Sequence, residues 1–196
     1  MRENTARFQP ATLDEWRAWL AEHHQDRPEG VWLVMWRAGS GGPRIPYDEL
    51  VEQALCFGWI DSTGRALDAG RTMVWFTPRK ARSGWSRLNK QRIERLGAAG
   101  EMAPAGLALV EAAKADGSWT LLDAVEDLTV PPDLEAAFAA APPAGANWDA
   151  FPRSAKRAML LWIVQARRPA TRAARVAEVA GRAAVGERAN SGSAPR

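Results

Sequence analysis

The sequence is poor in the side chains that many catalytic and metal sites use. It has 196 residues but only one cysteine and two histidines. A single cysteine excludes an internal disulfide and is typical of a reducing compartment. The histidines, His23 and His24, are adjacent, so on a helix they point about 100° apart and cannot easily bind one metal ion. We therefore predict no metal and no cofactor, and we interpret the two histidines as a polar helix end.

Several sequence signatures are also missing. No apolar run reaches the roughly 18 residues needed to span a bilayer, and the longest candidate is residues 158–166. The N-terminus, MRENTARFQP, has no apolar signal-peptide core, so we expect a cytoplasmic protein without a transmembrane segment. Residues 39–43 are rich in glycine but contain neither GxGxxG nor a Walker lysine. No HExxH, CxxC or Ser/His/Asp order is present, so no specific motif supports an enzyme.

Acidic side chains are scarce at the C-terminal end. The formal net charge is +3, but residues 1–146 carry 16 basic and 20 acidic side chains, whereas residues 147–196 carry 10 and 3. This asymmetry has two readings, a solvated helix face or non-specific nucleic-acid binding through the basic C-terminal helices. The second is less favoured, because no helix-turn-helix, RRM or KH signature accompanies the arginines. Those arginines are Arg167, Arg168, Arg172, Arg175 and Arg182.

The apolar pattern predicts an α+β fold. Strands are expected near residues 30–37, 59–67 and 71–77, with the last two joined as a hairpin through Asp68-Ala69-Gly70. A small antiparallel sheet would pack with helices in a core domain, residues 1–141. Residues 141–145, rich in proline and alanine, would link it to a helical C-terminal subdomain, residues 142–185, followed by a flexible tail, residues 186–196. Helix starts are predicted near Thr12, Pro46, Ser83, Pro104, Pro132 and Pro169.

The stretch 53–89 carries the most chemistry, because rings and charges alternate where a core strand would be uniformly apolar. Arginine forks bind carboxylate or phosphate, and indole faces stack on flat groups or cations. A helix that starts near Ser83 would add the positive end of its dipole. We predict a surface within residues 59–89 that binds an anionic or planar small ligand or a protein partner. Its residues are Trp59, Asp61, Arg65, Arg79, Lys80, Ser83, Trp85 and Asn89.

The same charges have a purely structural interpretation, in which they form a salt-bridge network that anchors the hairpin to the following helix. Most of the ten tryptophans are expected in the core, with Trp59, Trp85 and Trp119 as the better surface candidates. Cys56 is expected at a helix C-terminus, where the dipole disfavours a thiolate, so we interpret it as a small buried hydrophobe. Asp68 suits a hydrogen-bonding turn position better than an acid–base pair with Asp61.

Several segments together resemble one family. They are ALCFGWIDS at 54–62, FTPRK at 76–80, SGWS at 83–86, GEMAPAG at 100–106 and ARRPATR at 166–172. These motifs are similar to those of the YdeI/OmpD-associated family, also called bacteriocin-protection or OmdA-like proteins, from about Phe8 to Val185. The resemblance implies a small bacterial cytoplasmic protein linked to tolerance of antimicrobial peptides and envelope stress. It implies no reaction and no catalytic residues.

The leading hypothesis is therefore a non-enzymatic stress or peptide-tolerance protein with a binding surface on residues 59–89. The first alternative is a small-molecule enzyme that uses the same pocket. A closed cavity lined by Asp61 and Arg79 would favour that alternative. Nucleic-acid binding through the C-terminal helices is the second alternative, and the sequence makes no prediction of oligomeric state.

Overall fold

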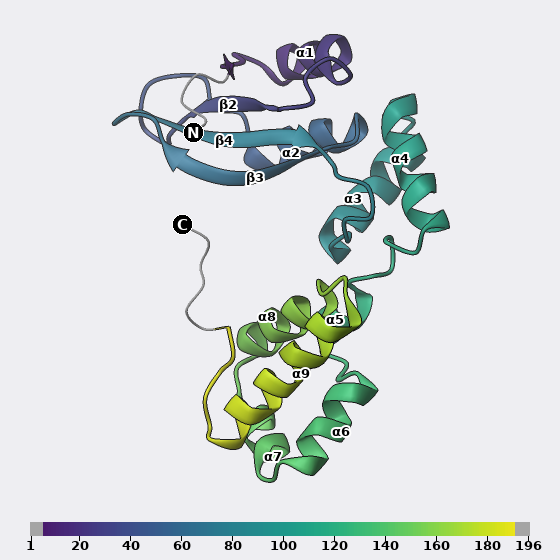
Figure 1. Ribbon diagram of the computed structural model, residues 1–196. Helices are drawn as coiled ribbons and strands as arrows, with labels where there is room; N and C mark the ends of the chain where they lie inside the picture. Colours follow the sequence, from purple (N-terminus) through teal and green to yellow (C-terminus); the bar gives the residue numbers. More distant parts are fainter. Residues whose placement is uncertain (1–5, 191–196) are drawn as a thin grey trace. The chain divides into compact units, whose positions relative to one another are not determined.

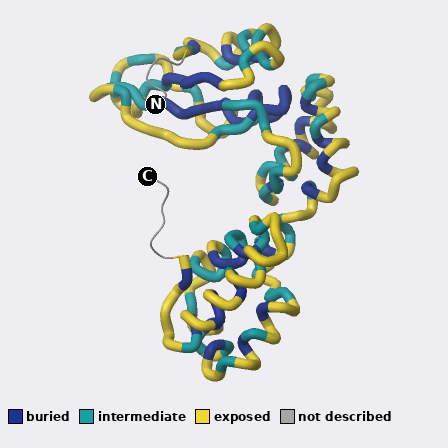
Figure 2. Tube along the Cα trace, viewed as in Figure 1, coloured by how far each residue is buried: buried dark blue, intermediate teal, exposed yellow. Residues whose placement is uncertain are grey.

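The computed structural model describes residues 6–190. Their contacts divide the chain into a first unit, which ends at Trp119, and a second unit, which begins at Thr120. Each unit has its own hydrophobic core, drawn in dark blue in Figure 2. The first unit combines a sheet with helices and the described part of the second is helical, so the predicted α+β class is confirmed.

One sheet of four strands lies in the first unit, in the order β1-β2-β4-β3 (Figure 1). Its strands are β1 (Arg7–Phe8), β2 (Val31–Trp36), β3 (Trp59–Ala66) and β4 (Arg71–Pro78). The three longer strands and the β3–β4 hairpin were predicted. The sheet is mixed rather than purely antiparallel, because β1 pairs with β2 in parallel. A strand of two residues is too short to leave a periodic signal in the sequence.

Four helices accompany the sheet: α1 (Leu13–His23), α2 (Tyr47–Cys56), α3 (Arg87–Ala98) and α4 (Pro104–Ala115). The predicted cap of α1 is present, since the Thr12 hydroxyl accepts a hydrogen bond of 3.2 Å from the Glu15 amide. Trp16 and Leu20 of α1 share one buried core with Leu50 of α2 and with alternate residues of β2 and β4. The central strands β2 and β4 are therefore buried, while the edge strand β3 is mostly exposed (Figure 2).

The start of α3 differs from the prediction. Ser83 does not cap the helix, because its hydroxyl donates to the Lys80 carbonyl at 2.7 Å and closes a turn. Ser86 is the N-cap instead, and its hydroxyl accepts from the Asn89 amide at 3.3 Å. Residues 79–85 therefore form a loop, named here the basic loop, rather than the first turn of a helix.

α4 packs closely on the end of α2. The Ala103 amide donates to the Cys56 carbonyl at 3.1 Å, just before α4 begins. A Cβ atom on Gly106 would lie 2.2 Å from that same carbonyl oxygen. Glycine is needed here because any side chain would force the two helices apart.

The second unit contains α5 (Asp123–Glu126), α6 (Pro132–Ala140), α7 (Ala144–Ala150), α8 (Arg153–Val164) and α9 (Pro169–Ala184). The expected linker at residues 141–145 covers the turn between α6 and α7 and the first two residues of α7. The two helices share one core, since the Phe138 and Trp148 rings are 5.3 Å apart. The contacts thus place the division of the chain at residue 119, not at residue 141. Ala189 is buried in the same core, so packing continues into the expected tail, of which residues 191–196 lie outside the described residues.

Within residues 6–190, no helix has the length and apolar character that crossing a membrane requires.

Candidate anion-binding site

A small pocket lies between the basic loop and α4, within the first unit. Its volume is about 40 Å³, enough for roughly three water molecules. The basic loop supplies the polar wall, and the opposite wall is the C-terminal half of α4 and the residues after it. We call it the Arg79 pocket. It brings together four of the eight predicted site residues: Arg79, Lys80, Ser83 and Trp85.

The Arg79 side chain is held at the pocket by its own loop. Its guanidinium carbon lies 3.8 Å from the centroid of the Trp85 ring, a close cation–π contact. Its Nη2 donates to the Gly84 carbonyl at 2.9 Å, while its Nε is buried and has no hydrogen-bond partner. No carboxylate in residues 6–190 forms an ion pair with it. Burial lowers the pKa of Arg79 to about 10, although the charge of Asp61 acts in the opposite direction. Arg79 is thus a partly buried cation, still charged at neutral pH, with one unpaired donor.

Two further cations and one anion line the same pocket. Lys80 and Arg82 are exposed, and Arg82 has a φ of +59°, in the left-handed region that favours glycine. Asp116 lies on the α4 side, and Ser118, whose amide donates to it at 2.9 Å, lowers the pKa of its carboxyl group. Three positive charges thus face one negative charge, so the pocket favours an anion.

The tryptophans predicted for the surface are mostly in the core. Trp85 is 2% exposed and Trp59 is 1% exposed. The Trp59 indole donates to the His24 carbonyl at 3.1 Å, and Trp59 does not line the Arg79 pocket. Trp85 packs against Trp119 with their ring centroids 5.2 Å apart, and only Trp119 keeps part of its surface exposed. Trp85 therefore supports Arg79 from beneath, and a ligand could reach only its rim.

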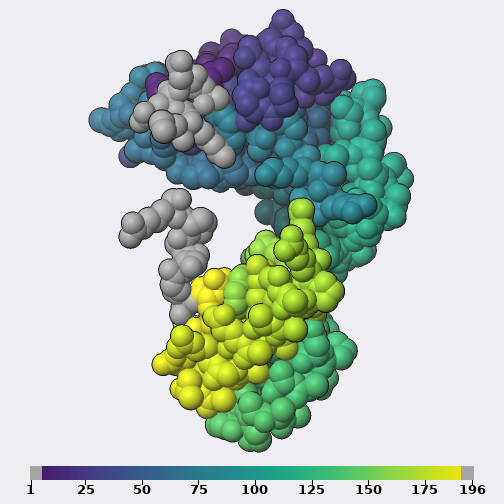
Figure 3. Space-filling model, in the orientation of Figure 1, coloured from purple at the N-terminus to yellow at the C-terminus, as the bar shows by residue number. Residues whose placement is uncertain are grey.

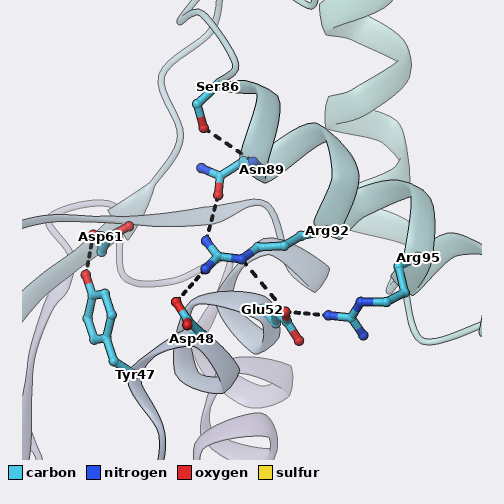
Figure 4. Close-up of polar contacts among 8 residues, drawn as sticks. All are labelled: Tyr47, Asp48, Glu52, Asp61, Ser86, Asn89, Arg92 and Arg95. Atoms are coloured by element: carbon cyan, nitrogen blue, oxygen red, sulfur yellow. Dashed lines mark hydrogen bonds and ion pairs between the residues drawn. The ribbon is translucent and has the colours of Figure 1, made fainter. Parts of the chain in front are cut away.

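The two candidate carboxylates have local partners. Asp61, on β3, accepts a hydrogen bond from the Tyr47 hydroxyl (Figure 4). Burial, and then this bond, raise the pKa of Tyr47 above its ordinary value, so the phenol stays protonated. Asp68 accepts from the Gly70 amide at 3.0 Å and pairs with Arg71, which lowers the pKa of its carboxyl group. Asp68 thus has the predicted turn role, and Asp61 does not line the Arg79 pocket.

Asn89 belongs to a separate polar network that joins α2 to α3 (Figure 4). Its Oδ1 accepts from Arg92 at 3.0 Å, and Arg92 also contacts Asp48 at 2.5 Å and Glu52 at 3.7 Å. Arg95 pairs with Glu52 from the outside. A salt-bridge network that anchors the hairpin to the following helix was one of the two interpretations of this region. The observed network instead joins α2 to α3, and it does not include Arg79 or the rest of the basic loop.

Arg65 lies on the opposite face of the sheet from α1 and α2. Its guanidinium carbon is 4.5 Å from the centroid of Trp32, in a cluster with Met73 and Trp75. The eight predicted site residues therefore do not form one surface. The prediction also lacked Asp116 and the apolar wall of α4, and no motif links those residues to the basic loop about thirty positions earlier.

Cys56 is fully buried, and burial raises the pKa of its thiol, in agreement with the prediction. We expect a thiol reagent at neutral pH to modify it at least about 100-fold more slowly in the native protein than in denaturant, because reaction requires local opening. The denatured protein is the control, and equal rates in the two states would contradict the assignment.

The C-terminal arginines are largely engaged within the second unit, where α9 forms much of the surface seen in Figure 3. Arg172 donates two hydrogen bonds to Asp133, at 2.7 and 3.0 Å. Arg175 donates to the Trp162 carbonyl and lies over its ring, and Arg182 pairs with Glu187. Three of the five arginines thus have structural partners, which weakens the nucleic-acid alternative.

The described residues also contain no group of three His, Cys, Asp or Glu side chains placed to hold a metal ion.

Comparison with known families divides the chain in the same way. The family described as a domain of unknown function (DUF8412) matches residues 8–109, which include the basic loop. The family described as "Bacteriocin-protection, YdeI or OmpD-Associated" matches residues 127–186, a shorter range than the motifs implied. No curated protein and no solved structure matches the chain. The chain belongs to the family described as a domain of unknown function (DUF8412), followed by a C-terminal segment that matches the bacteriocin-protection, YdeI or OmpD-associated family.

Proposed function

We propose that this chain is a non-enzymatic cytoplasmic stress protein that contributes to tolerance of antimicrobial peptides, and that its first unit binds an anionic group in the Arg79 pocket. The family of residues 127–186 supports the first part by its description. One observation carries the second part. Arg79 is desolvated, stacked on Trp85 and oriented by Gly84, yet its Nε has no acceptor.

A partly buried guanidinium without an ion-pair partner is unfavourable, because desolvation weakens the charged form and buried donors are normally hydrogen-bonded. An anion in the pocket would supply the negative charge. Arg82 supports the same reading, since a side chain at positive φ costs about 1 kcal/mol relative to glycine. The residue at this position is nevertheless an arginine, and it lines the pocket.

A closed cavity lined by both Asp61 and Arg79 would have favoured the enzyme alternative. The Arg79 pocket has the arginine without that aspartate, whose carboxylate is bonded to Tyr47. The Ser83 hydroxyl and the Asp116 carboxylate at the pocket have local partners, because Ser83 donates to the Lys80 carbonyl and Asp116 accepts from the Ser118 amide. A binding role therefore fits the pocket better than a catalytic one.

We expect millimolar acetate or phosphate to raise the thermal midpoint of the wild-type protein, since an anion that binds only the folded state stabilises it. Arg79→Gln should remove this shift. Arg82→Gly should reduce it while keeping the fold, because glycine suits the left-handed backbone at that position. Differential scanning fluorimetry at constant ionic strength gives the measurement.

Arg44→Gln is the matched control, because Arg44 is exposed, lies outside the pocket and loses the same charge. An anion-dependent shift that is the same in wild type, Arg79→Gln and Arg82→Gly would rule out the site. Tolerance is tested separately in the host, by survival in a cationic antimicrobial peptide with each variant expressed at equal level. If Arg79→Gln protects as well as Arg44→Gln does, the link between pocket and tolerance is wrong.

A further inference from the structure

The Arg79 pocket has two chemically different walls. The basic loop presents Arg79, Lys80 and Arg82, whereas α4 presents the aliphatic side chains of Leu109, Ala112 and Ala113. We infer that the ligand is a carboxylate attached to a compact apolar group, an inference that rests on the anion site proposed above. The carboxylate would lie against the charged side chains of the basic loop, and the hydrocarbon would lie against α4.

Shape favours a carboxylate over a tetrahedral oxyanion, because a carboxylate is flat. A planar group also matches the guanidinium fork, which lies over the Trp85 ring.

The apolar wall favours a carboxylate that carries hydrocarbon over inorganic phosphate, because each methylene removed from water strengthens binding by about fourfold. Asp116 lines the same pocket, and its carboxylate accepts a hydrogen bond of 2.9 Å from the Ser118 amide.

Three sources share this chemistry: a free organic acid, a free amino acid and the C-terminus of a peptide. Asp116 distinguishes the second, because an ammonium group next to the carboxylate could pair with it. A peptide C-terminus has an uncharged amide N–H at that place, so it gains less from Asp116 than an ammonium group does.

The test measures the affinity of the full chain for isobutyrate, isobutyramide and inorganic phosphate by calorimetry at one ionic strength. Isobutyrate should bind at least about tenfold more tightly than phosphate, and isobutyramide should not bind, because it lacks the charge that Arg79 requires. Phosphate binding that equals or exceeds isobutyrate binding overturns the carboxylate inference and leaves the anion site standing. If neither anion binds in a way that depends on Arg79, the anion site itself fails.

Two matched variants test the apolar wall. Ala112→Leu narrows the pocket and should weaken isobutyrate at least about fivefold, through lost space beside Arg79. Ala115→Leu is the control, since Ala115 is exposed on the same helix but does not line the pocket. Equal affinities in the two variants would place the ligand away from α4 and overturn the inference.

The source is identified with valine, N-acetyl-alanyl-valine and the C-terminal amide of that dipeptide. Tighter binding of valine than of isobutyrate, abolished by Asp116→Asn, supports a free amino acid. Binding of the acetylated dipeptide but not of its amide supports a peptide C-terminus, and binding of isobutyrate alone supports a small organic acid. Equal binding of the dipeptide and its amide contradicts a carboxylate ligand.

Discussion

Gly106→Ala should lower the free energy of unfolding by about 2–3 kcal/mol, although alanine is the better helix former. The new Cβ would lie 2.2 Å from the Cys56 carbonyl oxygen and 2.9 Å from the Met102 methyl group. The first of these atoms is backbone and cannot rotate away, so α4 must shift from the end of α2. Because α4 also forms the apolar wall of the Arg79 pocket, anion affinity should fall as well. Urea denaturation gives the stability and calorimetry the affinity.

Two other helical glycines serve as controls for this prediction. Cβ atoms added at Gly97 of α3 or Gly181 of α9 would meet no atom within 4 Å. Alanine there should therefore stabilise the protein by about 0.5–1 kcal/mol, the difference in helix propensity. If Gly106→Ala were as stable as these two variants, the close contact between α2 and α4 would be disproved.

Arg92→Met should destabilise the first unit by about 2–3 kcal/mol. The Arg92 side chain is 11% exposed and binds Asn89, Asp48 and Glu52, so it joins α2 to α3 (Figure 4). Removing it leaves the partly buried Glu52 carboxylate with one fewer positive partner, and the remaining charge is costly. Asp48 is 75% exposed and can be hydrated, which keeps the loss below that of a fully buried pair.

Arg95→Met is the matched control, because Arg95 pairs with the same Glu52 but is 58% exposed. It should cost no more than about 0.5 kcal/mol, as surface ion pairs usually do. Chemical denaturation of both variants in the same buffer measures their free energies of unfolding. Equal losses of this free energy would show that burial of Arg92 is not what stabilises the network.

Part of the candidate site was predictable from the sequence. Arg79, Lys80, Ser83 and Trp85 are near one another along the chain, and the structure does place them around one pocket. The prediction failed for residues whose environment depends on distant partners. Arg65 turns to the other face of the sheet, because alternate residues of a strand point to opposite sides.

Burial was the least predictable property. Trp85 was expected at the surface because it neighbours polar residues, but Trp119 packs against it and Arg79 covers it. Sequence neighbours say little about the contact with Trp119, since that residue lies in the segment after α4. The predicted Ser83 cap was wrong for a local reason, because its hydroxyl donates to the Lys80 carbonyl and closes a turn.

By itself the sequence determined the features whose causes are local. These are the three long strands, the hairpin closed by Asp68, the α1 cap at Thr12 and the buried thiol of Cys56. The tertiary structure alone decided that β1 joins the sheet and that the chain divides after Trp119. It also decided that α4 brings an apolar wall and Asp116 to the basic loop. Periodicity and turn chemistry act within a few residues, whereas a pocket forms where distant segments pack, and only the folded chain specifies those contacts.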